Sequence, residues 1–267
     1  MNNQHKGAQE SQKLLSAGDY LKKNRYPGRG IIFGRTPSGR LAAAYFIMGR
    51  SANSRNRIFS VKEPGSLYTQ AFDPEKVEDP SLILYRAAAR FPQRLIITNG
   101  DQTDTIYQAF SEGRTAREAL QTRCFEPDEP NYTPRISGVA TYTGSDFTYE
   151  LSILKSSDEK GSGCERFFFS YPSACGVGHL IHTYEGDGQP LPTFTGEPRK
   201  IAIPEGLGTL TEELWQALDE ENKVSLFVIR TAAIRKFVSS TRTRNNWRKI
   251  RSPGGSRGGI LRRPEQG

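Results

Sequence analysis

Short apolar runs separated by turn-forming residues dominate the hydrophobic pattern of this chain. The first two runs, residues 29–35 and 41–49, flank the segment Thr-Pro-Ser-Gly, which is typical of a turn, so together they predict a β-hairpin. Further runs predict strands at residues 57–63, 93–98, 133–144, 147–156, 165–172, 176–185 and 223–231. The run at 81–90 fits either a short helix or a buried strand.

Helices are predicted between blocks of these strands. The segments Thr115–Glu118 and Thr209–Glu212 have the spacing of a capping box, in which each side chain satisfies an exposed backbone donor at a helix start. A third helix is expected near Asp104–Gly113 and a short one near residues 14–23. Helices in pairs between blocks of strands predict a strand-rich α+β fold.

The composition fits a globular protein with a sizeable core, because the 267 residues are 35% hydrophobic and 10% aromatic. No apolar run approaches the roughly 20 residues of a membrane span, and the first residues lack the apolar core of a secretion signal. Three cysteines without CxxC spacing argue against a disulfide framework or a zinc site and fit a reducing compartment. We therefore expect a cytoplasmic protein with no membrane partner.

The net charge of +8 is concentrated at the C-terminal end. Residues 235–267 contain ten Lys or Arg and one acid, a net charge of +9, which leaves 27 basic and 28 acidic residues, a net of −1, in residues 1–234. Because the end is rich in Gly, Arg, Pro and Ser and lacks apolar periodicity, we expect a disordered tail at 239–267. We accordingly divide the chain into an N-terminal arm at 1–25, a domain at 26–238 and this tail.

The densest cluster of hydrogen-bond donors follows the second predicted strand. The segment GRSANSRNR at residues 49–57 contains Arg50, Ser51, Arg55 and Arg57. Planar guanidinium groups match phosphate or carboxylate oxygens in pairs, and serine adds a short directional donor, so the loop suits an anion site. A solvated loop with ordinary ion pairs explains the same residues, and Arg57 is expected to be surface.

Two further segments are candidates for chemistry. In TNGDQTDTI at 98–106, an Asn-Gly turn leads into polar residues at a helix start, which can bind an anion or simply cap the helix. In CFEPDEPNYTPRI at 124–136, three carboxylates, Glu126 among them, alternate with prolines that stiffen the segment. Neighbouring carboxylates raise one another's pKa, so this segment suits a proton donor near neutral pH, although an acidic surface loop has the same composition.

The histidine pair does not predict a metal site. His179 and His182 are three residues apart in a predicted strand, so their side chains point to opposite faces. We therefore expect no metal ligation by this pair and no resident cofactor.

Four segments occur in the same order as in a known family. They are YPGRGIIFGRTPSGRLAAAYFIMGRSANSRNR at 26–57, TNGDQTDTI at 98–106, FEPDEPNYTPRI at 125–136 and, more weakly, HTYE at 182–185. In these segments the chain resembles the archaeal-type inosine monophosphate (IMP) cyclohydrolases, a family that also has bacterial members, and we interpret the chain as a bacterial member. The resemblance covers roughly residues 25–235 and leaves out the arm and the tail.

The resemblance implies an enzyme that closes the ring of 5-formamidoimidazole-4-carboxamide ribotide to give IMP and water, the last step of purine synthesis. It implies a small nucleotide as partner, no specific nucleic acid and no cofactor, and it is compatible with a homo-oligomer. It also implies the four-layered αββα sandwich of the N-terminal-nucleophile hydrolases, used without self-processing. The predicted first strand agrees, because it begins near Tyr26-Pro27-Gly28-Arg29 and not at a Cys, Ser or Thr nucleophile.

Residue by residue, the resemblance implies a catalytic set and a substrate-binding set. The catalytic set is Arg55, Tyr85 and Glu126, with Tyr85 as a donor to the formyl oxygen and Glu126 as acid or base. The substrate-binding set is Arg29, Arg50, Ser51, Asn99, Asp104, Thr105 and Arg135. One departure is an extra Tyr132 within the family's Asn-Thr-Pro-Arg, which affects the geometry beside Glu126.

Two other functions remain open from the residues alone. One is an N-terminal-nucleophile amidohydrolase acting on a C–N bond, which requires processing that exposes Cys, Ser or Thr as a new N-terminus. The other is a nucleic-acid-binding module that uses the basic tail and draws its affinity from phosphate contacts.

Overall fold

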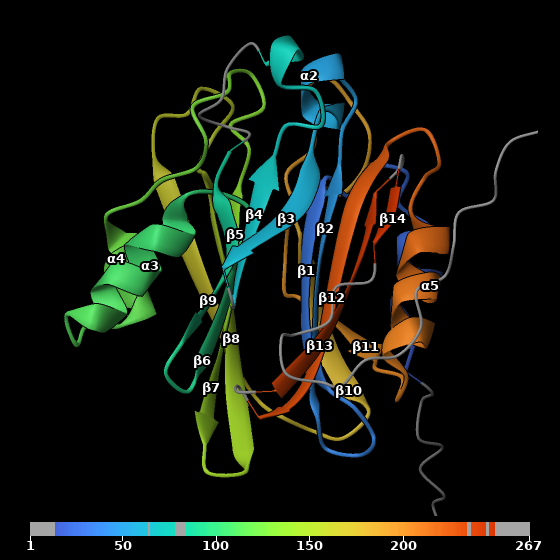
Figure 1. The fold of residues 1–267 in the computed structure, drawn as a ribbon. Coiled ribbons are helices and arrows are strands. Elements are labelled where there is room, and N and C mark those ends of the chain that lie inside the picture. Colours follow the sequence, from blue (N-terminus) through green and yellow to red (C-terminus); the bar gives the residue numbers. More distant parts are fainter. Residues whose placement is uncertain (1–13, 64, 78–83, 234–235, 244–245, 249–267) are drawn as a thin grey trace, which may run out of the picture.

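Two seven-stranded sheets that face each other form the centre of the molecule (Figure 1). The computed structural model describes residues 14–63, 65–77, 84–233, 236–243 and 246–248. Neighbouring strands within both sheets pair antiparallel. Together with a few helices, these sheets confirm the predicted α+β class.

The first sheet, sheet A, has the strand order β11-β10-β1-β2-β12-β13-β14. In that order its strands are Arg199–Ala202, Val177–His182, Arg29–Arg35, Leu41–Met48, Lys223–Ala233, Lys236–Thr243 and Asn246–Arg248. Strand β2 is buried along its whole length. Its odd-numbered residues join the core between the sheets, and its even-numbered residues join a second core under α1 and α5. Burial on both faces explains why β2 is a continuous apolar run and not an alternating one.

The second sheet, sheet B, has the strand order β3-β4-β5-β6-β7-β8-β9. In that order its strands are Ile58–Glu63, Ser66–Gln70, Arg86–Phe91, Arg94–Thr98, Arg135–Thr143, Asp146–Ser156 and Cys164–Pro172. One face packs on sheet A through residues such as Leu151 and Ile153, and the other packs on helices through Ile96 and Leu154.

The helices in the described residues are α1 at Ala17–Leu21, α2 at Ala52–Arg55, α3 at Gln102–Ser111, α4 at Ala116–Gln121 and α5 at Leu207–Ala217, with a 3-10 turn, η1, at Pro74–Lys76. All but α2 and η1 cover the outer faces of the two sheets (Figure 1). α1 and α5 pack on sheet A, and α3 and α4 pack on sheet B. Helix α2 lies at the upper end of the view, beyond the end of β2 (Figure 1). Over the described residues, no helix is both long and apolar enough to cross a bilayer.

Most local predictions along the first half of the chain are confirmed. Strands β1 and β2 form the predicted hairpin, closed where Thr36 N donates to Arg40 O at 2.8 Å. The ambiguous run at 81–90 is a strand from Arg86 onward. The Thr115–Glu118 capping box is present at the start of α4.

The second predicted capping box is wrong. Helix α5 begins at Leu207 after the N-cap residue Gly206, so Thr209 lies within its first turn. Leu207 packs against the core that buries Leu210 and Leu214. The apolar face of the helix therefore starts before Thr209, and packing decides the start rather than a local cap.

Two predicted boundaries also need correction. The division at residue 25 cuts off α1, whose Gly18 N donates to Glu213 Oε1 of α5 at 2.8 Å. The expected disordered tail starts too early, because residues 239–243 belong to β13 and 246–248 form β14. Pairing with β12 orders β13 without any apolar periodicity of its own. The rest of the arm and the tail, 1–13 and 249–267, lies outside the described residues.

The core under α5 gives a direct test of this packing. Leu214 has no exposed surface, so Leu214→Ala should lower the free energy of unfolding by about 2–5 kcal/mol, the range for buried Leu to Ala. Alanine keeps the helix propensity, so the loss reports the cavity. Gln216→Ala, on the exposed side of α5, should change the free energy of unfolding by less than about 0.5 kcal/mol. Urea titrations of both variants and the wild type would measure these changes. Equal losses in both variants would contradict this arrangement.

Candidate active site

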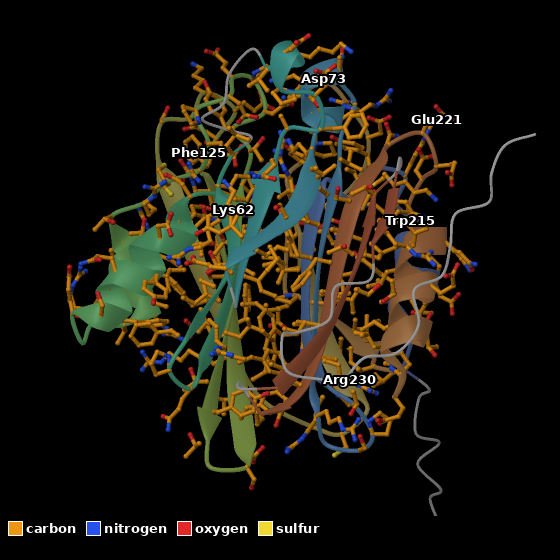
Figure 2. All side chains as sticks on the ribbon, in the orientation of Figure 1. Lys62, Asp73, Phe125, Trp215, Glu221 and Arg230 are labelled. Atoms are coloured by element: carbon orange, nitrogen blue, oxygen red, sulfur yellow. The ribbon has the colours of Figure 1, made fainter. Side chains whose placement is uncertain are left out.

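A cleft opens at the end of the two sheets where α2 lies (Figure 1). Its volume is about 510 Å³, within the range of small-molecule pockets. It is lined by Tyr26, Arg29, Arg50, Ser51, Asn53, Ser54, Arg57, Glu126, Asp128, Asn131, Thr133, Tyr184, Gln189 and Leu191. These residues come from around β1 and α2, from the segment before β7 and from the segment after β10. Phe125, the neighbour of Glu126 in the chain, also lies in the upper part of the view (Figure 2).

Four residues predicted from the sequence meet in this cleft. They are Arg29, Arg50, Ser51 and Glu126. With Arg57 and Asp128, the lining contains three arginines and two carboxylates, a net charge of +1. Such a lining attracts an anionic ligand and still contains a carboxyl group for proton transfer.

Arg29 is placed by a constrained backbone at the start of β1. Gly28 has φ +74°, and a Cβ there would collide with Thr183 Oγ1, which itself accepts from Arg29 N at 3.1 Å. The Arg29 Nε is buried with no hydrogen-bond partner among the described residues. Burial opposes the charge of this guanidinium, but the Glu126 carboxylate raises the pKa of Arg29 above its ordinary value. Arg29 therefore stays a cation inside the protein.

Glu126 is 3% exposed, and its backbone N donates to Thr133 O at 2.9 Å. Burial raises the pKa of the Glu126 carboxyl, and the positive charges of Arg29 and Arg135 offset only part of the rise. The carboxyl can therefore hold a proton at a higher pH than an exposed glutamate, as a general acid requires.

Arg57 is a cleft residue that sequence reasoning missed. It is 5% exposed, and its Nε and Nη1 are buried without a hydrogen-bond partner in the described part of the chain. Burial lowers the pKa of Arg57, and the nearby charge of Arg29 lowers it further. Asn53, also in the lining, has a buried Oδ1 acceptor that likewise finds no hydrogen-bond partner among the described residues. The cleft thus presents unsatisfied donors and an unsatisfied acceptor, which a bound ligand can pair.

The structure does not bring Arg55 into the cleft. Ser51 caps α2 by accepting from Ser54 N at 3.1 Å, and the single helical turn that follows leaves Arg55 exposed. There the Arg55 Nε donates to Gly49 O at 3.0 Å, and Nη2 reaches Asn222 Oδ1 at 3.5 Å. Arg55 ties α2 to its neighbours, and Arg57 takes the inward position. A capping signal at Ser51 could have shown that residues 52–55 turn.

Arg50 lies at the rim of the cleft. Its Nη1 donates to Asp187 Oδ1 at 2.6 Å and to Gly188 O at 2.9 Å. Its guanidinium also lies over the Tyr26 ring, 5.1 Å from the centroid. Arg50 therefore holds the segment after β10 against the start of β1, and its side chain keeps 30% exposure.

Tyr85 lies just behind the cleft lining. It is 6% exposed, and its hydroxyl is 2.6 Å from the hydroxyl of Tyr45 on β2. Burial raises the pKa of Tyr85, although Arg57 and Arg29 lower it in part, so the phenol keeps its proton and remains a donor. Its backbone is fixed by Thr69, whose Oγ1 accepts from Tyr85 N at 3.1 Å.

The predicted residues around α3 lie outside the cleft lining. Asn99 Oδ1 accepts from Ile136 N at 2.9 Å, and Arg135 Nη1 donates to Asp101 Oδ1 at 2.7 Å. Asp104 is exposed and pairs with Arg86 at 2.6 Å, in a different hollow. Thr105 is half-buried on α3 and does not line the cleft. Helix α3 starts at Gln102, so Asp104 and Thr105 are helical residues rather than loop ligands.

The extra Tyr132 is accommodated away from Glu126. Tyr132 adopts φ +42°, and its ring packs against Phe125, with centroids 5.4 Å apart. The carbonyl oxygen of the next residue, Thr133, still accepts the hydrogen bond from Glu126 N. The Thr133 Oγ1 lies 2.5 Å from the Tyr184 hydroxyl oxygen. Asp128 accepts from Thr133 N at 2.6 Å, so this wall of the cleft is a connected network.

The two strand histidines point to opposite faces, as predicted. His179 Nδ1 is 2.7 Å from the Tyr149 hydroxyl, on the side facing sheet B. His182 Nε2 is 2.8 Å from the Tyr20 hydroxyl, on the side of α1. Burial lowers the pKa of His179 to about 4 and that of His182 to about 3. Both rings are neutral structural partners.

A model of the family described as IMP cyclohydrolase-like protein matches residues 26–234. The chain belongs to the IMP cyclohydrolase-like family. Every cleft-lining residue of this family member lies inside the match, whereas α1, β13 and β14 lie outside it.

Three archaeal relatives named IMP cyclohydrolase align with parts of this family member. Identity to the Methanopyrus kandleri protein is 34% over 116 residues, 42% of this chain and 57% of the relative. Identity to the Methanococcus maripaludis protein is 28% over 160 residues, 57% of this chain and 77% of the relative. Identity to the Methanocella arvoryzae protein is 29% over 120 residues, 43% of this chain and 58% of the relative. The first and third alignments thus span just over half of those relatives.

The raised pKa of Glu126 predicts a pH-dependent stability. An unfolded Glu has a pKa near 4.5 and the folded one a higher pKa, so the folded state binds more protons between the two values. The stability from protonated Glu126 is therefore complete below about pH 4.5 and is lost as the pH rises through the folded pKa. Because Gln imitates the protonated form, the free energy of unfolding of Glu126→Gln minus that of the wild type should increase with pH.

Urea titrations between about pH 4 and pH 8 would measure this difference. Glu118→Gln is the matched control, because hydrogen bonds from Thr115 lower the pKa of Glu118 and predict the opposite sign. If the free energy of unfolding of Glu126→Gln minus that of the wild type stays constant or falls with pH, the raised pKa of Glu126 is contradicted.

Proposed function

We propose that this chain is an IMP cyclohydrolase, which closes the ring of 5-formamidoimidazole-4-carboxamide ribotide to give IMP and water. One observation carries the proposal: buried nitrogens of Arg29 and Arg57 that find no hydrogen-bond partner in the described ranges share a cleft with Glu126. Buried donors without partners are costly, so they are expected where a ligand supplies the acceptors. The cleft volume and its net positive lining suit a mononucleotide, and the names of the three relatives agree.

We also propose that the fold is the four-layered αββα sandwich of the N-terminal-nucleophile type. In support, α1 and α5 cover sheet A, sheets A and B share a core, and α3 and α4 cover sheet B. Strand β1 begins at Arg29, so a cationic binding group stands where hydrolases of that type begin with a nucleophile.

The reaction is intramolecular, which shifts the task of the enzyme toward orientation. The carboxamide nitrogen of the substrate attacks its own formyl carbon, a C–N bond forms, and the former formyl oxygen leaves as water. Holding the two groups in the attacking geometry supplies a large part of the acceleration. Strand ends and a connected loop network give this cleft the rigidity that orientation needs.

We assign the charge-bearing roles to the buried residues of the cleft lining, Arg29, Arg57 and Glu126, which we call the floor of the cleft. Negative charge develops on the formyl oxygen during attack, and the donors of Arg29 and Arg57 can stabilise it. Tyr85, held by Tyr45, would add a neutral donor behind them. Glu126 would protonate the departing oxygen, in keeping with its raised pKa.

We assign the 5′-phosphate to the rim, where Arg50 and Ser51 lie. Asn53 Oδ1, a buried acceptor, would pair with a carboxamide N–H. Arg135 and Asn99 would act indirectly, by ordering the chain that follows the segment with Glu126. Asp104 and Thr105 have no assigned contact with the substrate.

The function itself is tested by turnover of the formamido ribotide. Purified full chain should convert it to IMP, followed as the rise in ultraviolet absorbance when the purine ring closes. The protein should act catalytically, with many equivalents of product per chain. A pure, folded sample that produces no IMP above the uncatalysed rate would refute the proposal.

The two arginines on either side of Asn56 give a matched test of the site. Arg57→Ala removes an inward cation and should lower kcat/KM by about 100-fold or more, equivalent to about 2.7 kcal/mol. Arg55→Ala removes an exposed side chain that bonds Gly49 O outside the cleft, and it should lower kcat/KM by less than about fivefold. The reverse order of effects would restore Arg55 as the catalytic arginine and remove Arg57 from the floor.

A further inference from the structure

The start of helix α3, in the segment TNGDQTDTI, lacks a side-chain cap. Asp101 occupies the N-cap position, where an aspartate usually accepts a hydrogen bond from a backbone N–H of the first turn. The Asp101 side chain makes no such bond. Its Oδ1 instead accepts from Arg123 Nη2 and, at 2.7 Å, from Arg135 Nη1. Contacts with two arginines from outside the helix therefore take the place of a cap that would stabilise it.

The two arginines mark the ends of residues 124–134, which we call the Glu126 segment. Arg123 comes directly before the segment, and Arg135 is the first residue of β7. Inside the segment, Glu126 N donates to Thr133 O at 2.9 Å, and Thr133 N donates to an Asp128 carboxylate oxygen at 2.6 Å. Because these bonds hold the segment together internally, its position against the sheets depends largely on how its two ends are fixed.

Each end has a contact of its own, and Asp101 joins the two. Arg166 Nη2 donates to Arg123 O at 2.7 Å, which holds the first end against β9. Asn99 Nδ2 donates to Pro134 O at 2.9 Å, which holds the second end against the start of α3. The Asp101 carboxylate bonds side chains from both ends at a single oxygen atom, so it fixes the ends relative to each other.

The local structure lets Arg135 reach this carboxylate. A Cβ at Gly100 would lie 2.4 Å from Arg135 Nη1, so the glycine of the Asn-Gly turn leaves the necessary room. The fully buried Gln102 accepts from the same nitrogen at 2.8 Å. Burial opposes the charge of Asp101, but the hydrogen bond from Arg123 and the charge of Arg135 outweigh it, so the pKa of Asp101 lies below its ordinary value. The carboxylate is therefore ionised at neutral pH and offsets both cations.

We propose that Asp101 is a positioning residue, which keeps Glu126 beside the cations of the cleft by holding both ends of the Glu126 segment. Asp101 does not line the cleft, so it acts without touching the ligand. This role rests on the proposed function, in which Glu126 is the proton donor. It gives the TNGDQTDTI segment a part in ordering that donor rather than in binding the substrate.

The charges around Glu126 make its position measurable. Burial raises the pKa of Glu126, and the charge of Asp128 adds to the rise. The charges of Arg29, Arg135 and Arg57 lower it. If the Glu126 segment moves away from these arginines, the pKa of Glu126 should therefore rise.

Two substitutions break the Asp101 contacts from opposite sides. Asp101→Asn removes a negative charge and Arg123→Met removes a positive one. Positioning predicts that the pKa of Glu126 rises in both variants, by about half a pH unit or more. Charge alone predicts opposite directions, because loss of a carboxylate lowers the pKa of another carboxyl and loss of a cation raises it. The Asp101 side chain keeps 52% exposure, so its variant should fold, which circular dichroism would check.

Asp146→Asn is the matched control. Asp146 also pairs with an arginine, Arg35, at 2.7 Å, but it lies at the other end of β7 from Arg135, opposite Thr143. Its substitution should leave the pKa of Glu126 within about 0.2 pH units of the wild type, because separated charges are screened.

Carbon-13 NMR of the full chain, labelled at the glutamate side-chain carboxyl, would measure this pKa between about pH 4 and pH 9. Glu126→Gln identifies the signal by its absence. The titration needs no substrate, so its outcome does not depend on whether the wild type produces IMP. A pKa of Glu126 that falls or stays unchanged in Asp101→Asn, or that shifts in opposite directions in Asp101→Asn and Arg123→Met, would overturn the role of Asp101.

Turnover of the formamido ribotide measures the consequence. Asp101→Asn and Arg123→Met should each lower kcat by about tenfold, because the proton donor is displaced, and Asp146→Asn should change kcat by less than about twofold. The pH above which kcat falls should move upward with the pKa of Glu126. Full kcat in Asp101→Asn would also overturn the role of Asp101. A wild type without turnover would refute the proposed function, and the titration would still decide whether Asp101 positions Glu126.

Discussion

Burial of the β1–β2 hairpin on both faces is the constraint on which the rest of the structure depends. Ile31, Phe33, Tyr45 and Ile47 belong to the core between the sheets, and Ile32, Ala44 and Phe46 belong to the core under α1 and α5. A hairpin in this position has little freedom to shift, because both neighbouring layers would have to repack. The residues at its ends are therefore fixed as well. Arg29 begins β1, and the segment after β2 leads directly into α2 and Arg57.

The fixed hairpin explains how the protein tolerates cations in its interior. The charge of Arg29 lowers the pKa of Arg57, and burial opposes the charge of both guanidinium groups. The Glu126 carboxylate, which precedes a strand of the opposite sheet, offsets part of this cost, while burial raises the pKa of Glu126 itself. Such a cluster contributes little to stability, and under the proposed function a nucleotide would bring negative charge and acceptors to it. The electrostatics of the cleft thus favour an anionic ligand, in agreement with the proposed function.

The sequence was sufficient for features that depend on local pattern. Turn chemistry and apolar runs predicted the hairpin. The family resemblance added Arg29, Arg50, Ser51 and Glu126 as site residues, and these four line the cleft. It was insufficient where tertiary packing decides. Arg55 ends one short turn of helix and is exposed, whereas Arg57, two residues later, is buried, and no apolar pattern predicts a helical turn of 4 residues. Strand β13 owes its order to pairing with β12, which composition alone does not report.

The site also joins the two sheets, and this connects its chemistry to the stability of the whole core. Arg29 and Arg57 flank strands of both sheets, since β1 belongs to sheet A and β3, which follows Arg57, belongs to sheet B. Glu126 precedes β7, also in sheet B, and Tyr184 follows β10 in sheet A. The cleft therefore has its shape only while the two sheets keep their relative position. A substitution in the shared core that lets one sheet slide would change the separation of Glu126 from Arg29, and with it the pKa values on which the proposed proton transfer depends. In this molecule the aromatic core between the sheets is thus a part of the geometry of the proposed active site, and Tyr85 is a member of that core with a proposed contact to the substrate.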